Sequence, residues 1–519
     1  MGLLTNPVEN TEQVYKKVPK PDIIEETIRR WGDIMMTKRT AMQPKIQFCT
    51  IEDLMPKEHF LRDVYNTMDF SFVYDRVAHL YSAVGRPSID PVIIVKMLLI
   101  GYLYDIFSER KLMSEIQVNI AYRWFLEIDL DEAVPDHSTL SQLRRRKFNN
   151  SRLFEDIFDE VVRKCIDIGL VTGETLLTDS THIRANAAND KRETITVKHE
   201  PSAYMKKLDE IAVAEGLIKA ESSAKEKTVE QINCITDPDC GLLKRPGKPT
   251  GFHYLNHQTV DAGSGIITDV FVTPGNVADN TPHSDRIRYQ IEKYGFQTKE
   301  VGGDAGYDSP EIHAEMLKLE IKTYIPEVAW QNQHDEQLYC AKNFLYNAEQ
   351  DAYICPNNCL LRFASFRRGR GCKVYKSRVS DCSGCPHRTK CIPGKMKYKE
   401  VSRSYHKAEY DLQHENNKTS RYHEVQRLRK IWCEGTFAHQ KLRHCMTRAK
   451  MRGIAQTTGQ CLLSACAVNL KRLIKWKKDR LSYLHNSILL SFPALTGFFM
   501  PFCQQSHKLA SHCRFISIF

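Results

Sequence analysis

The sequence lacks a long uninterrupted apolar segment, which argues against a membrane-spanning protein. Its first 30 residues are polar and contain no apolar core of the kind that marks a secretion signal. The apolar run at 91–107 is interrupted by Lys96 and Asp105, and the run at 486–503 is broken by prolines and a glycine. We therefore expect a cytoplasmic protein in which residues 91–107 form a buried helix.

Disulfide bonds are also not expected, although cysteine is abundant. The chain has 17 cysteines, and a protein without an export signal normally stays in a reducing compartment. Six of the cysteines fall between Cys355 and Cys391. This clustering suggests a metal site more than a set of covalent bridges.

Acidic residues are too few to balance the basic ones. The formal net charge is +11 and the isoelectric point is about 8.8. Residues 399–480 contain 19 Lys and Arg against 7 Asp and Glu, so the basic excess is concentrated there. A basic surface indicates a polyanionic partner such as nucleic acid or an anionic membrane.

Changes in composition and periodicity divide the chain of 519 residues into several regions. The predicted regions are a polar N-terminal arm at 1–45 with a short helix at 23–31, a helical domain at 46–168, an α/β domain at 169–326 and 400–480 with a charged insertion at 190–250, a Cys-rich insertion at 327–399, and a C-terminal tail at 481–519. Within the charged insertion we expect a helix near 203–220 and mobile chain elsewhere.

The helical domain ends in a strongly basic helix. Asp90 before Pro91 is a typical helix start, and Asp136 or Ser138 could cap the later helix. That later helix carries the consecutive residues Arg144, Arg145 and Arg146. A compact helical set ending in a basic helix is what a helix-turn-helix DNA reader needs. The alternative is a helical domain with a solvated basic face.

The α/β domain alternates strands and helices. Expected strands lie at 174–183, 255–261, 266–272, 299–304 and 321–326, and expected helices at 281–295 and 309–319. The segment Ala-Gly-Ser-Gly joins the second and third strands as a hairpin. This order predicts a mixed sheet with flanking helices, an α/β fold.

Three acidic residues stand out within this frame. Asp179 and Asp304 each close a predicted strand, and Glu434 lies on a basic helix with Lys430 and Lys441 on the same face. Carboxylates from separate elements suit Mg²⁺, and lysines nearby would bind phosphate. Spacing alone does not select these three from 63 acidic residues.

The segments LLTDSTHIRANA, GGDAGYDSPE and EGTFAHQKLRHCMTRAKMRG resemble the three acidic motifs of bacterial insertion-sequence transposases of the DDE class. GRPSIDPVIIVKMLLIGYLYDI and VPDHSTLSQLRRR resemble the helical N-terminal domain of those proteins. The resemblance covers about residues 50–475. It implies a ribonuclease H-like catalytic domain, Mg²⁺ or Mn²⁺ held by Asp179, Asp304 and Glu434, and DNA as the partner. It also implies association with the bacterial nucleoid when the protein is bound to DNA.

One signature departs from the family. Related transposases carry Tyr-x2-Arg-x3-Glu-x6-Lys around the glutamate, where this chain has Arg427, Lys430, Glu434 and Lys441. The replacement of Arg by Lys puts a bidentate phosphate contact in doubt. Arg443, two residues beyond Lys441, is a further candidate for DNA contact.

The cysteines of the Cys-rich insertion form two short groups. The candidate Zn²⁺ ligands are Cys355, Cys359, Cys382, Cys385 and Cys391. Two short Cys pairs separated by a loop can supply tetrahedral ligands for a structural zinc. The alternative is a set of reduced core thiols. The same insertion is rich in Arg and Lys, which could touch DNA or form a solvated charge run.

We therefore predict a transposase that cuts DNA at the ends of a mobile element and joins those ends to target DNA, working as a homodimer because two ends must be joined. Two alternatives stay open: a metal-dependent nuclease that does not join, and an inactive zinc-containing DNA-binding protein descended from a transposase. The unusual C-terminal tail could also mark a truncated or frame-altered copy.

Overall fold

The computed structural model describes residues 48–82, 84, 88–148, 151–199, 202–219, 227–245, 250–328, 339–392 and 394–491. The predicted N-terminal arm at 1–45, including its helix at 23–31, and the tail beyond residue 491 lie outside these residues. Contacts divide the chain between Asp53 and Leu54. No helix among the described residues is long and apolar enough to cross a membrane.

The N-terminal part of the chain is helical, as expected. Its helices are α2 (Ile51–Leu54), α3 (Phe60–Thr67), α4 (Phe72–Val77), η1 (Ala78–Leu80), α5 (Pro91–Leu103), α6 (Glu109–Val118), α7 (Ile120–Leu126), α8 (His137–Leu143), the π-turn η2 (Arg144–Phe148) and α9 (Leu153–Asp167). Asp90 caps α5 by accepting a hydrogen bond from the Val92 N–H at 2.7 Å, and Asp136 caps α8 through the Ser138 N–H at 2.8 Å. Both predicted caps are therefore confirmed.

Helix α5 is buried on almost all of its surface, which confirms the interpretation of the apolar run. Its one lysine, Lys96, is 4% exposed and pairs with the Glu127 carboxylate at 2.7 Å. The ammonium also lies 5.0 Å from the centre of the Tyr65 ring. A buried lysine is tolerated because both its charge and its stem have partners.

The central sheet has six strands in the order β4-β5-β1-β7-β8, with β6 paired to β5. Their bounds are β1 (Thr175–Arg184), β4 (Gly241–Leu243), β5 (Gly251–Asp261), β6 (Ile267–Pro274), β7 (Glu300–Gly302) and β8 (Lys322–Tyr324). β5 is antiparallel to β1, whereas β7 and β8 run parallel to it. A central first strand with an antiparallel hairpin on one side and two parallel strands on the other is the ribonuclease H-like arrangement. The predicted α/β fold class is confirmed.

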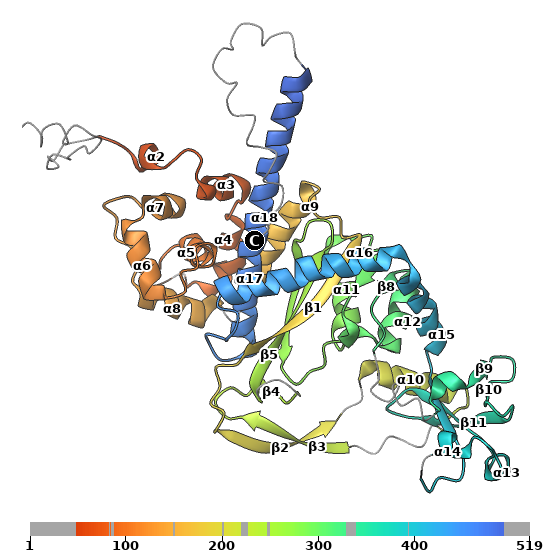
Figure 1. Cartoon of the computed structure of the whole chain (residues 1–519). Helices are drawn as coiled ribbons and strands as arrows, with labels where there is room; N and C mark the ends of the chain where they lie inside the picture. The colour runs from red at the N-terminus through yellow and green to blue at the C-terminus, as the bar shows by residue number, and fades with distance from the viewer. Residues whose placement is uncertain are drawn as a thin grey trace, which may run out of the picture. The chain divides into compact units, whose positions relative to one another are not determined.

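The helices of this domain come from both halves of the chain. Helices α11 (His283–Tyr294) and α12 (Pro310–Lys318) lie between strands, and the C-terminal helices are α15 (Lys407–His414), η6 (Glu415–Lys418), α16 (Ser420–Arg429), the π-turn η7 (Lys430–Glu434), α17 (Gly435–Arg443) and α18 (Ile454–Ser491). In Figure 1, α16 and α17 form one continuous rod that passes across β1.

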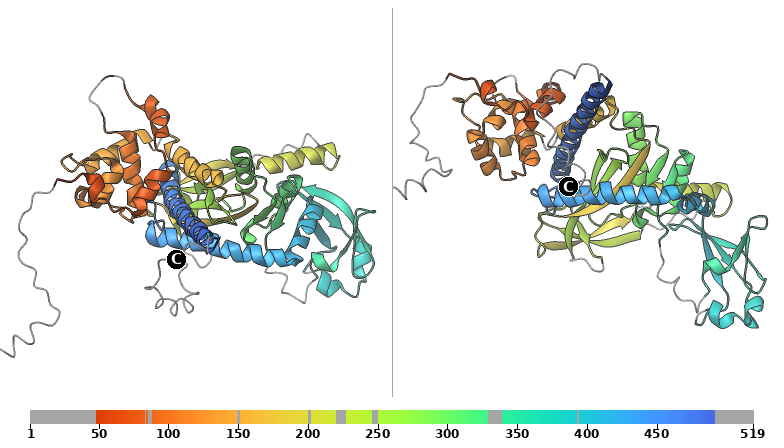
Figure 2. Two further views of the ribbon diagram at one scale, coloured as in Figure 1. Left: turned by 90° about the horizontal axis from the view of Figure 1, so that it is seen from above. Right: turned by 45° about the horizontal axis from the view of Figure 1, so that its top comes forward.

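The long helix α18 joins the helical N-terminal region to the sheet. It packs on α5 and α9 on one side and on β6 on the other, and Figure 2 shows it beside the N-terminal helices. The fully buried Asn469 side chain bonds both backbone groups of Ile267 on β6, each at 2.8 Å. Side chains of the N-terminal helices, the sheet and α18 belong to one hydrophobic core. One hydrophobic core is thus continuous between the N-terminal helices, the sheet and α18.

The charged insertion is more ordered than its composition suggested. It contains α10 (Ala203–Ala214), as expected, but also the paired strands β2 (Arg192–His199) and β3 (Lys227–Cys234). The expectation of mobile chain in 192–199 and 227–234 was wrong. The Thr and Val residues of both strands favour extended structure, and cross-strand pairing outweighed the high charge.

The Cys-rich insertion contains a separate five-stranded sheet in the order β13-β12-β11-β10-β9. Its strands are β9 (Leu345–Asn347), β10 (Ala352–Ile354), β11 (Leu360–Arg367), β12 (Cys372–Lys376) and β13 (Glu400–Ser404), and it also holds α13 (Val379–Ser383) and α14 (Arg388–Cys391). The last strand lies beyond the predicted boundary at residue 399.

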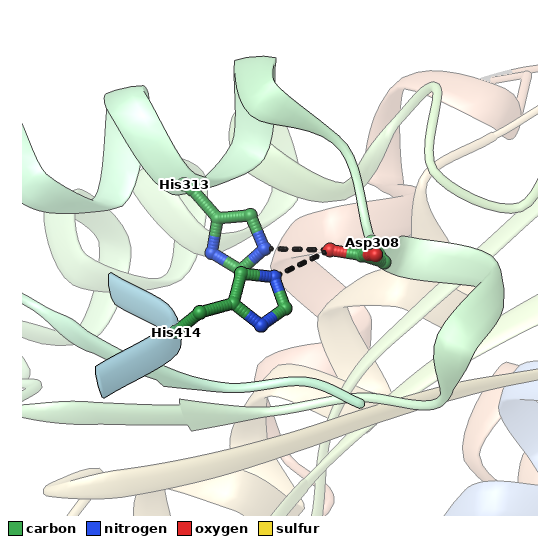
Figure 3. Close-up of side chains that lie close together, drawn as sticks. All are labelled: Asp308, His313 and His414. Carbon is green, nitrogen blue, oxygen red and sulfur yellow. Dashed lines mark hydrogen bonds and ion pairs between the residues drawn. The ribbon is translucent and has the colours of Figure 1, made fainter. Parts of the chain in front are cut away.

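A buried hydrogen-bond network fastens α15 and η6 to the edge of the main sheet (Figure 3). Asp308 Oδ1 accepts from His313 Nε2 at 3.0 Å and from His414 Nε2 at 2.9 Å. Asp308 Oδ2 accepts from the Tyr410 hydroxyl and the Val328 N–H, both at 2.8 Å. Burial acts to raise the pKa of Asp308, but these hydrogen bonds outweigh it and hold the pKa well below its ordinary value.

Replacing Asp308 by Asn should destabilise the fold by about 2 kcal/mol at pH 7, because buried donors lose a charged acceptor. The pKa of Asp308 is lower in the folded than in the unfolded protein. Its contribution to stability is therefore complete above the unfolded pKa of about 3.9 and is lost as pH falls from there to the folded pKa. The difference in unfolding midpoint between the wild type and Asp308→Asn should thus narrow below about pH 4. Thermal unfolding followed by circular dichroism from pH 3 to 8 measures it. The exposed Asp285→Asn is the control, and an equal effect of both changes would contradict the prediction.

Candidate active site

Asp179 lies in the middle of the sheet instead of at a strand end. β1 continues five residues past it to Arg184, and Asp179 pairs with Gln258 on β5. The predicted strand end was wrong because the hairpin partner β5 is long enough to pair with all of β1. On the other side, the register with β7 stops at Leu177. Asp179 therefore lies beyond the part of β1 that pairs with β7, on a stretch of β1 that pairs only with β5 among the described strands.

The carboxyl group of Asp179 is 8% exposed and surrounded by charge. Burial raises its pKa to about 6, against the lowering effects of the Arg429 guanidinium and the Ser180 N–H. The negative charges of Asp304 and Glu434 raise the pKa further. Both acids predicted from sequence are thus close enough to Asp179 to affect its ionisation.

Asp304 follows β7 directly, as predicted. Its Oδ1 accepts from the Gly306 N–H at 2.8 Å and caps the 3-10 turn η3 (Ala305–Tyr307). The glycines around it serve close packing. A Cβ on Gly302 would lie 2.6 Å from Val425 on α16, so only glycine lets that helix reach the sheet. A Cβ on Gly306 would lie 3.0 Å from Asp304 Oδ1.

Glu434 occupies the last position of the π-turn η7, between α16 and α17. Its side chain is 54% exposed, and Oε1 accepts from Arg429 Nη2 at 2.9 Å. A π-turn contains one residue more than a regular helical turn, so residues five apart come onto the same face. The sequence analysis assumed a regular helix and placed Lys430 beside Glu434. The structure places Arg429 there.

Arg429 is a residue of the candidate site that the sequence analysis did not single out. Its guanidinium bridges two of the acids, with Nη1 at 2.9 Å from Asp179 Oδ2 and Nη2 at 2.9 Å from Glu434 Oε1. The π-turn brings this arginine, five residues before Glu434, onto the face of the glutamate. The only sequence signal was an Arg directly before Lys430.

The π-turn is anchored on both sides. Trp432 donates its indole N–H to the Ala262 carbonyl at 3.0 Å and covers Gly265, where a Cβ would lie 2.4 Å from the ring. Gly265 has φ +76°, so the β5–β6 turn requires glycine there for two reasons. Gln426 on α16 donates to the carbonyls of Gly303 at 3.0 Å and Tyr324 at 2.8 Å. These contacts fix the height and rotation of the helix that carries Glu434.

A fourth carboxylate, Asp279, lies beside the predicted three. It accepts from the Ser180 hydroxyl at 2.9 Å and pairs with Arg245 at 3.4 Å. Burial and the negative charges of Asp179, Asp279 and Asp304 hold the pKa of the buried Tyr307 well above its ordinary value. Asp279 precedes α11 in a loop without a motif of its own, which explains why it was not predicted.

The residues predicted to contact DNA differ in their surroundings. Lys430 is exposed on η7, Lys441 is half-buried on α17, and Arg443 is 60% exposed near Asp105 at 3.6 Å. Arg145 and Arg146 are exposed on η2. Arg144 is different: it is 15% exposed and pairs with Glu109 at 3.1 Å. The DNA contacts of Arg144, Arg145 and Arg146 stay predictions.

The predicted zinc cysteines gather at one end of the insertion's sheet. Cys382 and Cys391 are buried, and Cys355, Cys359 and Cys385 are half-buried. The Cys359 N–H donates to Cys355 Sγ at 3.3 Å. Burial and the neighbouring Cys355 and Cys385 raise the pKa of the Cys359 thiol. No three of these sulfurs lie within 4.8 Å of one another in the part of the insertion that the structure describes.

Asp308, His313 and His414 form the one group of three such ligand types that meets this distance among the described residues (Figure 3). Its hydrogen bonds argue against a metal. The Asn417 amide nitrogen donates to Ile325 O at 2.7 Å and lies 3.1 Å from His414 Nδ1, so Nδ1 accepts. Nε2 of the neutral ring then carries the proton that Asp308 accepts and has no lone pair for a metal. The group is a structural network.

Two family models match the chain. One, described as Transposase domain (DUF772), matches residues 49–146, and the other, described as Transposase DDE domain, matches residues 354–474. The first covers the helices from α2 to η2, and the second covers most of the Cys-rich insertion and the helices that carry Arg429 and Glu434. No curated protein matches the sequence.

Among solved structures, the piggyBac transposase synaptic complex with hairpin DNA matches at 8% identity and a TM-score of 0.24, covering 82% of each chain. The Mos1 transposase paired-end complex with left transposon end matches at 8% identity and a TM-score of 0.15, covering 59% of this chain and 68% of that one. Likeness at these TM-scores carries no argument. The chain contains two segments that match transposase domains, one at 49–146 and one of the DDE type at 354–474, and these matches support DNA transposition as its function.

Proposed function

We propose that the protein carries out two successive phosphoryl transfers at Asp179, Asp304 and Glu434. The observation that carries the proposal is the convergence of Glu434 and the buried Asp179 on one guanidinium, each carboxylate lying 2.9 Å from Arg429. In the first step, water attacks a phosphodiester at the element's end and the 3′-oxygen leaves as a hydroxyl. In the second, that hydroxyl attacks a target phosphodiester and displaces the target's 3′-oxygen.

The donor set fits a divalent metal. All three acids offer hard oxygen ligands of the kind Mg²⁺ and Mn²⁺ prefer, and the Arg429 guanidinium already shows that the space between Asp179 and Glu434 accepts a cation. Bound Mg²⁺ or Mn²⁺ would activate the attacking oxygen and stabilise the leaving one. Asp179, Asp304 and Glu434 would hold these ions. Lys430 and Lys441 would hold DNA phosphates beside them.

DNA is the proposed partner along a basic surface formed by η2 and the helices around Glu434. Lys430, Lys441, Arg443, Arg145 and Arg146 supply the positive charges. Joining two ends of one element requires two active sites, so we propose a homodimer in the complex with DNA. The proposed location is the bacterial cytoplasm, at the nucleoid when DNA is bound.

Replacing Asp304 by Asn should reduce metal-dependent DNA cleavage by more than about a hundredfold, because one metal-holding charge is lost. The assay uses DNA from both flanks of the element with Mg²⁺ or Mn²⁺, and EDTA should abolish cleavage. The exposed Asp285→Asn is the matched control. Unchanged cleavage in Asp304→Asn would favour an inactive DNA-binding descendant and refute the catalytic assignment.

The same assay separates a transposase from a simple nuclease. Pre-cut flanking DNA with a free 3′-hydroxyl is mixed with a supercoiled plasmid and the metal. Joined products are expected with the wild type and not with Asp304→Asn. Cleavage without any joined product would identify a nuclease of the same fold.

Replacing Lys441 by Gln should weaken DNA binding at low salt and reduce the slope of log affinity against log salt by about 1, because one phosphate contact is lost. Fluorescence anisotropy with a labelled duplex, over a series of KCl concentrations, gives the slope. The exposed Lys322→Gln on β8 makes the same charge change away from the site. If both variants changed the slope equally, only net charge would be responsible.

A structural zinc in the Cys-rich insertion is part of the proposal. It is supported by the Cys355–Cys359 turn, in which the Cys359 N–H donates to Cys355 Sγ at 3.3 Å, and by the pKa of the Cys359 thiol, which burial, Cys355 and Cys385 raise. Burial, Cys382, Cys355 and Cys385 raise the pKa of the Cys391 thiol in the same way. Four thiolates there would give tetrahedral ligation.

Purified wild-type protein should contain about one zinc per chain by elemental analysis, as expected for one four-thiolate site. Cys385→Ser should lose this zinc and unfold at a lower temperature. Cys372→Ser is the control, since Cys372 lies on β12 and its sulfur faces the Arg370 carbonyl at 2.9 Å. Wild-type protein without zinc, or equal loss in both variants, would contradict the zinc site.

A further inference from the structure

We propose that Arg429 occupies a metal position in the DNA-free protein, and that a DNA phosphate withdraws it, so that complete metal loading depends on DNA. This inference rests on the proposed function, because it concerns the same carboxylates. It adds a role for a residue that the predicted acidic motifs do not include.

The contacts of Arg429 define the competition. Two nitrogens of one planar guanidinium lie 2.9 Å from Asp179 Oδ2 and 2.9 Å from Glu434 Oε1. A Mg²⁺ ion shared by these oxygens would lie about 2.0–2.1 Å from each. The guanidinium and the ion would therefore need the same space, and both are positive. One must leave before the other can bind.

The competition affects one side of the site more than the other. Among the described residues, the ion pairs of Arg429 are with Asp179 and Glu434, and none is with Asp304. Asp304 is held separately, through the Gly306 N–H. An ion between Asp179 and Asp304 thus competes with Arg429 through one shared ligand, whereas an ion between Asp179 and Glu434 competes through both.

A DNA phosphate is the group best suited to withdraw Arg429. A guanidinium can bind one phosphate through two parallel hydrogen bonds. In the structure Nη1 and Nη2 of Arg429 bond two different carboxylates, and a phosphate could accept from both nitrogens at once. The exposed Lys430 is the next residue along the chain and would draw a phosphate toward η7. When Arg429 exchanges the two carboxylates for a phosphate, Glu434 becomes accessible to metal. Its side chain is already 54% exposed.

Such an exchange has a functional advantage. Without DNA, Arg429 neutralises a buried cluster in which Asp179 is affected by two further acids. Withdrawal of the arginine leaves that negative cluster uncompensated, which favours a divalent ion at the moment when DNA is in place. Cleavage chemistry would then be assembled only on bound substrate.

The test measures Mn²⁺ binding to the full chain, by titration calorimetry and by electron paramagnetic resonance of free Mn²⁺. Without DNA, Arg429→Gln should bind a second Mn²⁺ at least about tenfold more tightly than the wild type. Adding a duplex of arbitrary sequence should tighten the second site in the wild type and change Arg429→Gln much less. Arg427→Gln, which removes an exposed positive charge on the same helix, should behave as the wild type.

Equal or weaker Mn²⁺ binding by Arg429→Gln, with its circular dichroism spectrum unchanged, would overturn the inference. If Arg429→Gln does not fold, Arg429→Lys is used, which keeps the charge and loses the planar fork. It should bind the second Mn²⁺ more tightly than the wild type does, and failure to do so would equally overturn the inference. Asp179→Asn identifies Mn²⁺ bound elsewhere. If Arg429→Gln does not bind the second Mn²⁺ more tightly but Asp304→Asn still loses DNA cleavage, the inference fails and the proposed function stands.

Discussion

The gathering of negative charge around a buried Asp179 is the constraint on which the active site depends. Placing carboxylates close together in a partly dry space is unfavourable unless a cation is present. That cation is Arg429, which lies 2.9 Å from both Asp179 and Glu434. These two ion pairs connect the helical segment that carries Glu434 to the centre of the sheet.

Packing around α16 and η7 holds these charged groups in one geometry. The π-turn aligns residues five apart, so Arg429 and Glu434 can face Asp179 together. Gly302 lets α16 approach the sheet, and Trp432 fills the space left by Gly265 in the β5–β6 turn. At the other end of the same segment, the Asp308 network holds α15 and η6 to the loop that begins at Asp304. Together these contacts hold α15, α16 and η7 in position on the sheet.

The helical N-terminal region packs against the rest of the chain through α18. α5 and α9 pack on α18, and α18 packs on β6 through the paired hydrogen bonds of Asn469. The shared core holds the N-terminal helices and the helical segment that carries Glu434 in a defined relation.

The sequence by itself predicted the helical N-terminal region, the order of strands and helices in the α/β domain outside its insertions, and the caps at Asp90 and Asp136. These features are local, because they depend on alternation, capping side chains and residues adjacent in the chain. Only the tertiary structure showed that Asp179 pairs with β5 but lies beyond the residues of β1 that pair with β7, because both registers are set by distant partner strands. It also decided that 192–199 and 227–234 pair as strands, because pairing across a long insertion leaves no local signal. Above all, it placed Arg429 instead of Lys430 beside Glu434, because a π-turn shifts the helical register by one residue and the packing of Trp432 against the hairpin holds that shift.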